Sequence, residues 1–494
     1  MVDTSIITDI FGDVSPIAPI VILFIGALLA PAVNFALKSR RALTGVTMAI
    51  IVISAIVNAI LLVGDYQGTY AGLFTYDALA GLMILLFQCV AFLVAMVSGA
   101  SKEVTRLHFG AYSSLLLAAT SGMMFVATAS DLITIFVGVE LTSISSYALV
   151  AMKRSDPRAS EAAVKYVIIG GLSTALTLYG MSMIYGVTGT TNLHEIALEL
   201  ANVQPDLFAI GIIMMIAGYG FKIAAVPFHM WAPDVYEGSA TPVSAFLATG
   251  SKKMGIVVFL KIFIILFIPA TMLSEGATES VQYIFAILAT LTMTVGNVVA
   301  ISQRNIKRML AYSSIAQAGY ILIALAVMSE YATAGALFHM FTHVFMKGGA
   351  FLVVGALICR GVGENISDYS GLLKRAPFLA FAMLIFLFSL AGIPPLAGFT
   401  SKFILFSGAI NVDGEITQWV WLAFVAVINS AISLYYYARV VKAMFIDKGD
   451  SIERIKVPMA FTVAISICLI LTVVLGVGWE WIFEYCEKAA STLF

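Results

Sequence analysis

One apolar stretch of this chain contains both a lysine and a proline: Gly218-Tyr219-Gly220-Phe221-Lys222-Ile223-Ala224-Ala225-Val226-Pro227-Phe228-His229. Proline lacks a backbone donor and clashes with the preceding turn, so a helix containing this stretch must be interrupted. A second stretch has the same features: Ala391-Gly392-Ile393-Pro394-Pro395-Leu396-Ala397-Gly398-Phe399-Thr400-Ser401-Lys402. An interrupted backbone persists at membrane depth only inside protein or beside water, so both stretches predict interior positions.

The composition places both stretches in a membrane protein. The 494 residues are 61% hydrophobic and 11% charged, and the mean hydropathy is +1.00. Soluble domains average about 25% charged residues. We therefore predict an all-α integral membrane protein with about fourteen transmembrane helices. The apolar runs centre near Phe24, Ser54, Phe87, Ala118, Glu140, Leu172, Met215, Phe259, Thr290, Leu322, Phe345, Phe388, Ile428 and Ile470.

The basic residues fall mainly in alternate loops. Lys38, Arg304 and Lys442 are examples, whereas the intervening loops carry acids such as Glu195 and Asp206. By the positive-inside rule, the basic loops face the cytoplasm. Both termini are then predicted on the outer face of the cytoplasmic membrane.

The two interrupted helices are the seventh and the twelfth, which lie five spans apart. An odd separation makes corresponding helices run in opposite directions, which is typical of an inverted repeat with ion sites at the broken helices. We predict an N-terminal three-helix segment at 1–108, a first five-helix repeat at 109–270, a second, inverted repeat at 271–446, and a C-terminal helix at 447–494. The alternative is that the prolines only kink packed helices.

Glu140 is the only acidic residue near the centre of a predicted span, in Phe136-Val137-Gly138-Val139-Glu140-Leu141-Thr142-Ser143. Burial disfavours the charged forms of a carboxylate and a lysine, and pairing restores them. A Glu140–Lys222 couple is therefore a candidate switch, because its separation favours release of a proton from Lys222. The alternative is a static ion pair that fixes helix register.

Further lysines lie in the predicted spans. Lys165 lies about one turn into the sixth span. It is either a relay group or a side chain that reaches the cytoplasmic surface. Lys252 and Lys253 are adjacent in the eighth span, and adjacent helical residues point about 100° apart. We expect Lys252 to face an internal path, and Lys253 and Lys261 to pack or to reach an interface.

His339, His343 and Lys347 recur every four residues in the eleventh span, so they form one polar stripe. The imidazole pKa near 6.5 suits a proton relay. A metal site and a packed polar core are the alternatives, although no acidic third ligand is near in the sequence. His229, just after Pro227, is a weaker candidate. Together these residues predict a hydrated polar path with Lys222 and Lys402 as its principal stations.

The cysteines indicate that the chain holds no redox centre. Iron–sulfur and zinc sites need clustered thiolates, whereas the four cysteines are far apart: Cys89, Cys359, Cys468 and Cys486. We expect no cofactor and no metal in this chain, so that any redox chemistry occurs on another chain. The net charge of −1, without a basic run, does not suggest nucleic acid.

Several strings resemble the antiporter-like membrane subunits of complex I, subunit N in particular. They are Ser160–Tyr166, Tyr185–Leu193, Pro227–Gly238 and Pro394–Lys402. The resemblance implies a non-redox, proton-translocating subunit in the membrane arm of an NADH:quinone-type oxidoreductase, with other membrane subunits and the bilayer as partners and peripheral redox subunits as indirect ones. It makes Glu140 the modulating glutamate of helix five, Lys222 the proton lysine of helix seven, Lys252 the connecting lysine of helix eight, and Lys402 the distal lysine of helix twelve.

The stripe of His339, His343 and Lys347 looks more like that of the sister subunits and of cation/proton antiporters. It leaves room for an archaeal version, with coenzyme F(420) or ferredoxin as donor and methanophenazine as acceptor. The D-type membrane component of a multi-subunit sodium/proton antiporter is the main alternative function. A purely structural scaffold is a third, and it predicts that neutralising Lys222 or Lys402 is harmless.

Overall fold

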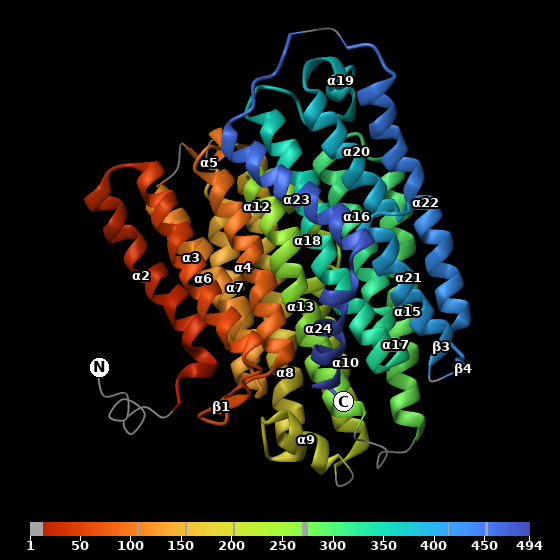
Figure 1. Ribbon diagram of the computed structural model, residues 1–494. Helices are drawn as coiled ribbons and strands as arrows, with labels where there is room; N and C mark the ends of the chain where they lie inside the picture. Colours follow the sequence, from red (N-terminus) through yellow and green to blue (C-terminus); the bar gives the residue numbers. More distant parts are fainter. Residues whose placement is uncertain are drawn as a thin grey trace.

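The computed structural model describes residues 13–105, 108–153, 156–200, 203–268, 275–412, 414–449 and 453–494. Its long helices run side by side, from α2 at one edge of the molecule to α22 at the other (Figure 1). Twelve helices of the described chain are long and apolar enough to cross a membrane. The chain is therefore a multi-pass, all-α membrane protein, as its composition predicts.

The N-terminal segment packs three long helices beside a small hairpin. Its elements are the 3-10 turn η1 (Ser15–Ile17), α2 (Ala18–Leu37), α3 (Arg40–Val63), β1 (Gly68–Tyr70), β2 (Phe74–Tyr76), α4 (Ala78–Ser98) and the short α5 (Lys102–Thr105). β1 and β2 pair antiparallel.

The next elements are α6 (Phe109–Thr128), α7 (Leu132–Ala151), α8 (Pro157–Thr188), α9 (Leu193–Glu199), α10 (Pro205–Ile223), α11 (Trp231–Gly238), α12 (Thr241–Phe246), α13 (Lys252–Phe259) and α14 (Ile265–Phe267). Two π-helical segments, η2 (Leu247–Ser251) and η3 (Leu260–Ile264), separate the last three.

The remaining elements begin with α15 (Glu275–Ser302), α16 (Ile306–Ile321), α17 (Ile323–Val327), α18 (Glu330–Ile358), the 3-10 turn η4 (Ile366–Tyr369), α19 (Leu372–Arg375), α20 (Pro377–Ala391) and α21 (Ala397–Ile410). They end with β3 (Asn411–Val412), β4 (Glu415–Ile416), α22 (Val420–Phe445), α23 (Met459–Val477) and α24 (Glu480–Ser491).

The predicted interruptions of the seventh and twelfth spans are confirmed. Residues 224–230 separate α10 from α11, and residues 392–396 separate α20 from α21. Both breaks contain a cis proline, Pro227 and Pro395. Every predicted span centre falls within a helix, except Leu322, which lies at the junction of α16 and α17. The centres at Phe259 and Phe388 lie in interrupted spans that are not among the twelve long apolar helices. The total of fourteen spans stays a prediction.

Matched backbone bridges mark the two predicted repeats. Asp131, the N-cap of α7, pairs antiparallel with Asn192, the N-cap of α9. Asn305, the N-cap of α16, pairs in the same way with Asn365, the N-cap of η4. The first bridge adjoins α9 at the lower end of the molecule in Figure 1, and the second adjoins α19 at the upper end. The two bridges therefore lie at opposite ends of the molecule, which is the arrangement that the predicted inverted repeat requires.

A cation caps the corresponding helix in each segment, the buried Lys261 in the first and the half-buried Arg439 in the second. Lys261 Nζ donates to the carbonyls of Ala127 and Ala129 at the end of α6, at 2.6 and 2.7 Å. Arg439 donates to the carbonyls of Ile301, at 2.7 Å, and Gln303 at the end of α15. Cations are favourable at helix C-termini because the last carbonyls lack partners there. The predicted boundaries of the repeats stay predictions, and the one at 270–271 lies outside the described residues.

Four small features were not expected from the sequence: the two hairpins, α9, and the separate final helix α24. Helix α24 buries Phe483 and Cys486, and its Lys488 forms an ion pair with Asp65 in the loop after α3. The C-terminus is thereby joined to the N-terminal segment.

Glycines bring the first two helices of each repeat close together. A Cβ atom at Gly122 of α6 would lie 2.7 Å from the carbonyl oxygen of Gly138 in α7. One at Gly296 of α15 would lie 2.6 Å from the backbone nitrogen of Ala316 in α16. Small residues of this kind let membrane helices approach at backbone distance.

We expect Gly122→Ala and Gly296→Ala each to destabilise the protein by about 1–3 kcal/mol, because the added methyl meets backbone that cannot move aside. Thermal unfolding of the purified full chain in one detergent measures the effect. Gly171→Ala is the matched control, since a Cβ atom there meets nothing within 4 Å. Equal stability of all three variants would show that these glycines do not set the helix separation.

Candidate functional site

Glu140 lies on α7 beside a very small cavity. Its side chain is half-buried, and Thr174 Oγ1 donates to its carboxylate at 2.8 Å. The space open to a water molecule is about 10 Å³, close to the room of a single water. The polar residues of its wall are Glu140, Ser143, Tyr147, Ser173, Thr174, Thr177, Tyr219 and Lys222.

Lys222 lies on the other side of the same cavity, in the last turn of α10 before the break. Its side chain is 3% exposed, and its ammonium donates to Ser143 Oγ at 2.8 Å. Ser143 is one turn beyond Glu140 on α7. Glu140 and Lys222 form no ion pair within 4.0 Å, so the cavity separates the predicted couple. The Ser143 hydroxyl does not link the two, because it donates to the carbonyl of Val139 at 2.6 Å.

Lys252 begins α13 directly after the π-helical segment η2. It is 1% exposed, and its Nζ atom has no hydrogen-bond partner. The nearest recorded interaction is with the ring of Tyr236, 5.9 Å from Nζ. One turn further along, a Cβ atom at Gly255 would lie 3.2 Å from Lys222 Cγ. The two lysines are therefore neighbours across a helix contact, without a hydrogen-bonded link in the described part of the chain.

Lys253 packs inside the protein and does not reach an interface, so it takes the first of the two positions expected for it from the sequence. It is also 1% exposed, and it lies close enough to His339, His343 and Lys347 to interact with them electrostatically. The reason is that α13 is enclosed on all sides by protein, so neither lysine has a lipid-facing direction available. Both lysines face buried ionisable groups.

The stripe on α18 lies in the core of the second repeat. His339 and His343 are fully buried, with ring centroids 6.1 Å apart. His339 Nδ1 is 2.9 Å from Ser401 Oγ, and its Nε2 is 2.9 Å from Gln317 Oε1. Because both nitrogens of His339 are engaged, neither is free to ligate a metal ion. Neither ring nitrogen of His343 has a partner.

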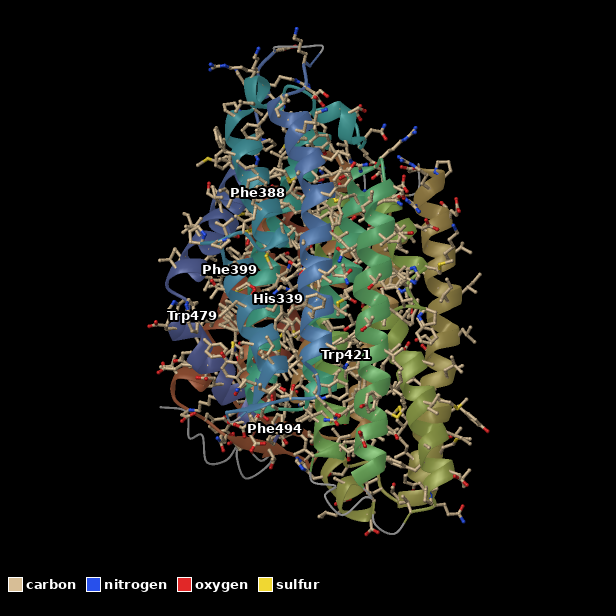
Figure 2. All side chains as sticks on the ribbon, turned by 90° about the vertical axis from the view of Figure 1, so that its right-hand side faces the viewer. His339, Phe388, Phe399, Trp421, Trp479 and Phe494 are labelled. Atoms are coloured by element: carbon tan, nitrogen blue, oxygen red, sulfur yellow. The ribbon has the colours of Figure 1, made fainter. Side chains whose placement is uncertain are left out.

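Lys347 completes the stripe and joins a hydroxyl chain. Its ammonium donates to Ser313 Oγ at 2.6 Å, and Ser313 in turn bonds to the hydroxyl of Tyr437. Figure 2 shows His339 at mid-height inside the bundle, between Phe388 toward one end and Phe494 toward the other. His339 thus lies near the middle of the bundle along its length (Figure 2).

Lys402 lies on α21 and caps the half-helix on the other side of the break. Its ammonium donates to the carbonyl of Leu390 at 2.8 Å and to Ser430 Oγ at 2.9 Å. It also lies 4.8 Å from the centroid of the Tyr320 ring, a cation–π contact. The α20 C-terminus therefore supplies the negative partner that no carboxylate among the described residues provides.

Gln317 connects His339 to Lys402, and the sequence did not point to it. Its Nε2 donates to the Leu390 carbonyl at 3.1 Å, the same oxygen that accepts from Lys402. A buried glutamine on a predicted span carries no signal of its own. Only the packing of α16 against α18 and α20 shows its position between two candidate relay groups.

We call the row of buried groups the polar axis: Glu140, Lys222, Lys252, Lys253, His343, Lys347, His339 and Lys402. Two sequence candidates do not belong to it. Lys165 has a side chain 42% exposed and pairs with Glu161 at 2.6 Å and Asp234 at 2.7 Å. His229, in the break after α10, is half-buried.

Lys165 belongs instead to a surface ionic cluster at the end of the bundle that carries the basic loops. The cluster joins the two repeats, since Arg158 pairs with Glu364 at 3.3 Å. Burial would raise the pKa of Asp156, but hydrogen bonds from Arg158 and Lys153 lower it to about 2. The members of the cluster are Glu103, Lys153, Asp156, Arg158, Glu161, Lys165, Asp234, Glu237, Lys307, Arg308 and Glu364.

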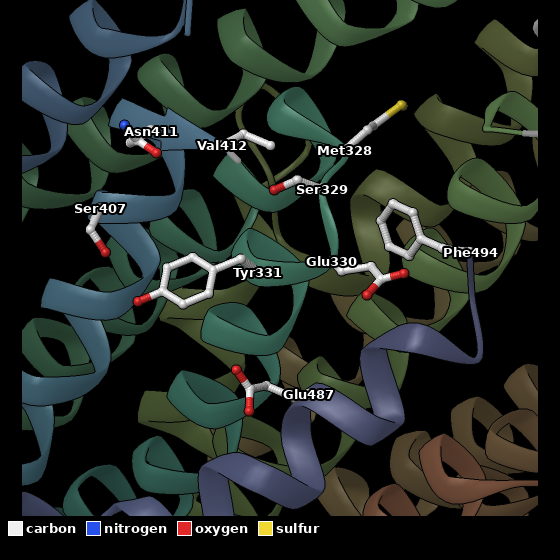
Figure 3. Close-up of a pocket in the computed structure, with 9 residues that line it drawn as sticks. All are labelled: Met328, Ser329, Glu330, Tyr331, Ser407, Asn411, Val412, Glu487 and Phe494. Carbon is white, nitrogen blue, oxygen red and sulfur yellow. The ribbon is translucent and has the colours of Figure 1, made fainter. Parts of the chain in front are cut away.

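A larger cavity, of about 970 Å³, lies apart from the polar axis at the opposite end of the bundle. The ends of α18, α21 and α24 line it, and the carboxylates of Glu330 and Glu487 face its interior (Figure 3). No member of the polar axis is among its lining residues.

Comparison with known proteins identifies the family. Residues 129–473 match the family described as "NADH:quinone oxidoreductase/Mrp antiporter, TM". The F(420)H(2) dehydrogenase subunit N of Methanosarcina mazei is 42% identical, over 84% of this chain and 84% of the relative. The NADH-quinone oxidoreductase subunit N of Bacillus anthracis is 40% identical, over 91% and 90%.

A solved structure agrees with these relatives. A chain of respiratory complex I from Thermus thermophilus superimposes with a TM-score of 0.78 and is 27% identical, over 94% of this chain and 98% of the other. This chain is therefore a member of the NADH:quinone oxidoreductase/Mrp antiporter membrane family, and it is of the subunit N type.

The buried lysines divide into two groups that stability measurements separate. Lys261→Met should lower the stability by about 1–3 kcal/mol, because it leaves two buried carbonyls without a donor. Lys252→Met should leave the thermal midpoint unchanged or raise it, since Lys252 Nζ has no partner to lose. Thermal unfolding of both variants in the same detergent makes the comparison. A destabilisation by Lys252→Met as large as that by Lys261→Met would mark Lys252 as a packing residue.

Proposed function

We propose that this chain is the proton-translocating subunit of the membrane arm of a complex I-like oxidoreductase. Electron transfer to a quinone-type acceptor takes place in other subunits and is coupled to proton movement along the polar axis. The observation that carries the proposal is the polar axis itself, a row of ionisable groups, all buried except the half-buried Glu140, that meets both broken helices in a chain of the subunit N type. Charges at this depth are costly and are retained where ions or protons move.

The Glu140 end of the axis is the proposed switch. Glu140 and Lys222 share a cavity with room for about one water, so the charge of either group acts strongly on the other. When Glu140 is ionised and near, it stabilises the ammonium of Lys222. When Glu140 is neutralised or moves away, Lys222 keeps only the Ser143 hydroxyl, and release of its proton is favoured.

The middle of the axis is where water must enter. Lys252 Nζ and both ring nitrogens of His343 are buried without hydrogen-bond partners. Buried polar atoms without partners cost free energy, and internal water commonly supplies the missing hydrogen bonds. A proton released at Lys222 would pass by such waters to Lys252, Lys253 and the histidine stripe.

Lys402 is the proposed distal station. The C-terminus of half-helix α20 stabilises its ammonium, while His339 approaches through Gln317 on one side and Ser401 on the other. A histidine beside a lysine in this arrangement can exchange protons with it as the local field changes. Rotation of the half-helix would alter the distance of the Leu390 carbonyl and hence the charge state of Lys402.

The proposed assembly and placement rest on the same relatives and on the distribution of the basic loops. We propose the cell membrane as location, basic loops in the cytoplasm and both termini outside, other membrane-arm subunits as neighbours, and peripheral redox subunits as indirect partners. We also propose that the chain binds no cofactor, on the wide spacing of its four cysteines. NADH and F(420)H(2) both stay open as donors, since relatives named for each are about equally similar.

The D-type component of a cation/proton antiporter is the alternative from the sequence. The family description includes such antiporters, but the two relatives cited above are both subunits N. The string Trp231–Gly238, which includes Asp234 and Glu237 of the ionic cluster, also favours subunit N. The comparisons do not favour the alternative.

Lys222→Ala and Lys402→Ala should each reduce proton translocation and the coupled electron transfer at least about tenfold, because each removes a proton carrier. Both rates are measured in membrane vesicles, with assembly checked on native gels. Lys374→Ala, an exposed lysine of α19, is the control. Undiminished rates in assembled Lys222→Ala complexes would refute the proposed mechanism.

Gln317→Leu should reduce translocation severalfold and change its pH profile, whereas Gln317→Glu should change the pH profile without the same loss of rate. Leucine removes the link between His339 and the Leu390 carbonyl, and glutamate keeps an acceptor for His339 but adds a titratable group. A merely structural glutamine would affect the rate at all pH values alike.

A further inference from the structure

Two arginines converge on a pocket at the end of the bundle that carries the basic loops. The pocket has a volume of about 420 Å³ and lies among the C-terminal ends of α15 and α22 and the turn η4. Its lining consists of Arg304, Asn365, Ile366, Ser367 and Arg439. The wall therefore carries two positive charges and no carboxylate.

Neither arginine is neutralised by an acid in the described part of the chain. Neither forms an ion pair within 4.0 Å, and the side chain of Arg304 has no recorded hydrogen bond. Arg439 uses two of its nitrogens on the α15 carbonyls, and its Nε is buried without a partner. A guanidinium has five donors in a fixed fork, so Arg439 retains donors beyond those the helix uses.

The two acids nearest in sequence to Asn365 of the pocket wall already have other hydrogen-bond partners. Glu364 accepts from Arg158 at 3.3 Å and from Asn305 at 3.2 Å. Asp368 accepts from the backbone nitrogen of Asn365 at 2.9 Å. The positive charge of the pocket is therefore not balanced by these acids, and an anion from outside the protein would balance it.

The surface next to the pocket, toward the membrane centre, is apolar. Tyr435 is one turn before Arg439 on α22 and is 62% exposed. Val298 on α15 is 52% exposed, one turn before the helix ends at Ser302. Further exposed apolar residues continue along the same two helices: Ile287, Leu291, Phe424, Val427, Ile428 and Leu434.

We propose that this pocket binds the phosphate of an anionic phospholipid, with the acyl chains lying along α15 and α22. Arginine pairs of this kind bind phosphate oxygens through parallel N–H donors. Basic pockets between transmembrane helices on the cytoplasmic side suit lipid head groups, because the phosphate layer lies at that depth. The Ser367 hydroxyl and the Asn365 amide add polar groups that fit the phosphate and its esters.

The test uses the purified, delipidated full chain in detergent. Phosphatidylglycerol should raise its thermal midpoint in a saturable manner, and phosphatidylcholine should do so much less. Arg304→Gln should weaken the apparent affinity for phosphatidylglycerol about fivefold, the loss expected for one arginine near the membrane surface. Ser367→Ala should weaken it to a smaller extent. Arg360→Gln, an exposed arginine outside the pocket, is the matched control.

Three results would overturn the proposal. Equal stabilisation by both lipids would show a general effect of lipid. Equal stabilisation by inorganic phosphate or glycerol phosphate would show a free-anion site. An unchanged affinity in both Arg304→Gln and Ser367→Ala would place phosphatidylglycerol elsewhere. Arg439 is left unchanged in the test because it also caps α15.

Discussion

An interrupted membrane helix must find partners for its freed backbone groups inside the protein, and the rest of this structure depends on how it does so. At the first break, the indole of Trp231 donates to the Phe221 carbonyl at 2.8 Å, and Thr292 accepts from the Val226 nitrogen at 3.0 Å. At the second, Lys402 takes the freed carbonyl of Leu390. At the second break, an ionisable group, Lys402, is itself the partner of the freed backbone carbonyl. The same hydrogen bond therefore satisfies the backbone and holds a proton.

The same physics separates the lysines that hold the fold from those that can exchange protons. Lys261 and Lys307 are as deeply buried as Lys252, but each donates to two carbonyls at a helix end. A proton on such a lysine is held by several kcal/mol of hydrogen bonding and helix-end charge. Lys252 has no such partners and Lys222 has one hydroxyl, so their protonation responds to neighbouring charges. Burial alone would not have distinguished the two groups.

The sequence predicted the elements whose signal is local. The breaks followed from prolines in apolar runs, and the polar stripe of α18 followed from helical spacing. The sequence left open whether Lys253 packs or reaches an interface, because the 100° rule says where a side chain points but not whether protein or lipid lies there. The π-helical segments beside Lys252 and Lys261 have no residue signature comparable to proline. Gln317, Ser430 and Tyr320 were missed because distant helices bring them to His339 and Lys402.

The two principal lysines occupy non-equivalent positions in the two repeats, and this makes a lateral row possible. Lys222 precedes its break, on α10, whereas Lys402 follows its break, on α21. In an inverted repeat, equivalent positions would lie at mirrored depths. Because the positions are exchanged as well as inverted, both lysines lie on the half-helices toward the same end of the molecule, the end of α9 and β3 in Figure 1. The ionisable groups therefore form a row that runs laterally, within the plane of the membrane, from the first repeat to the second. The row does not run from one membrane surface to the other.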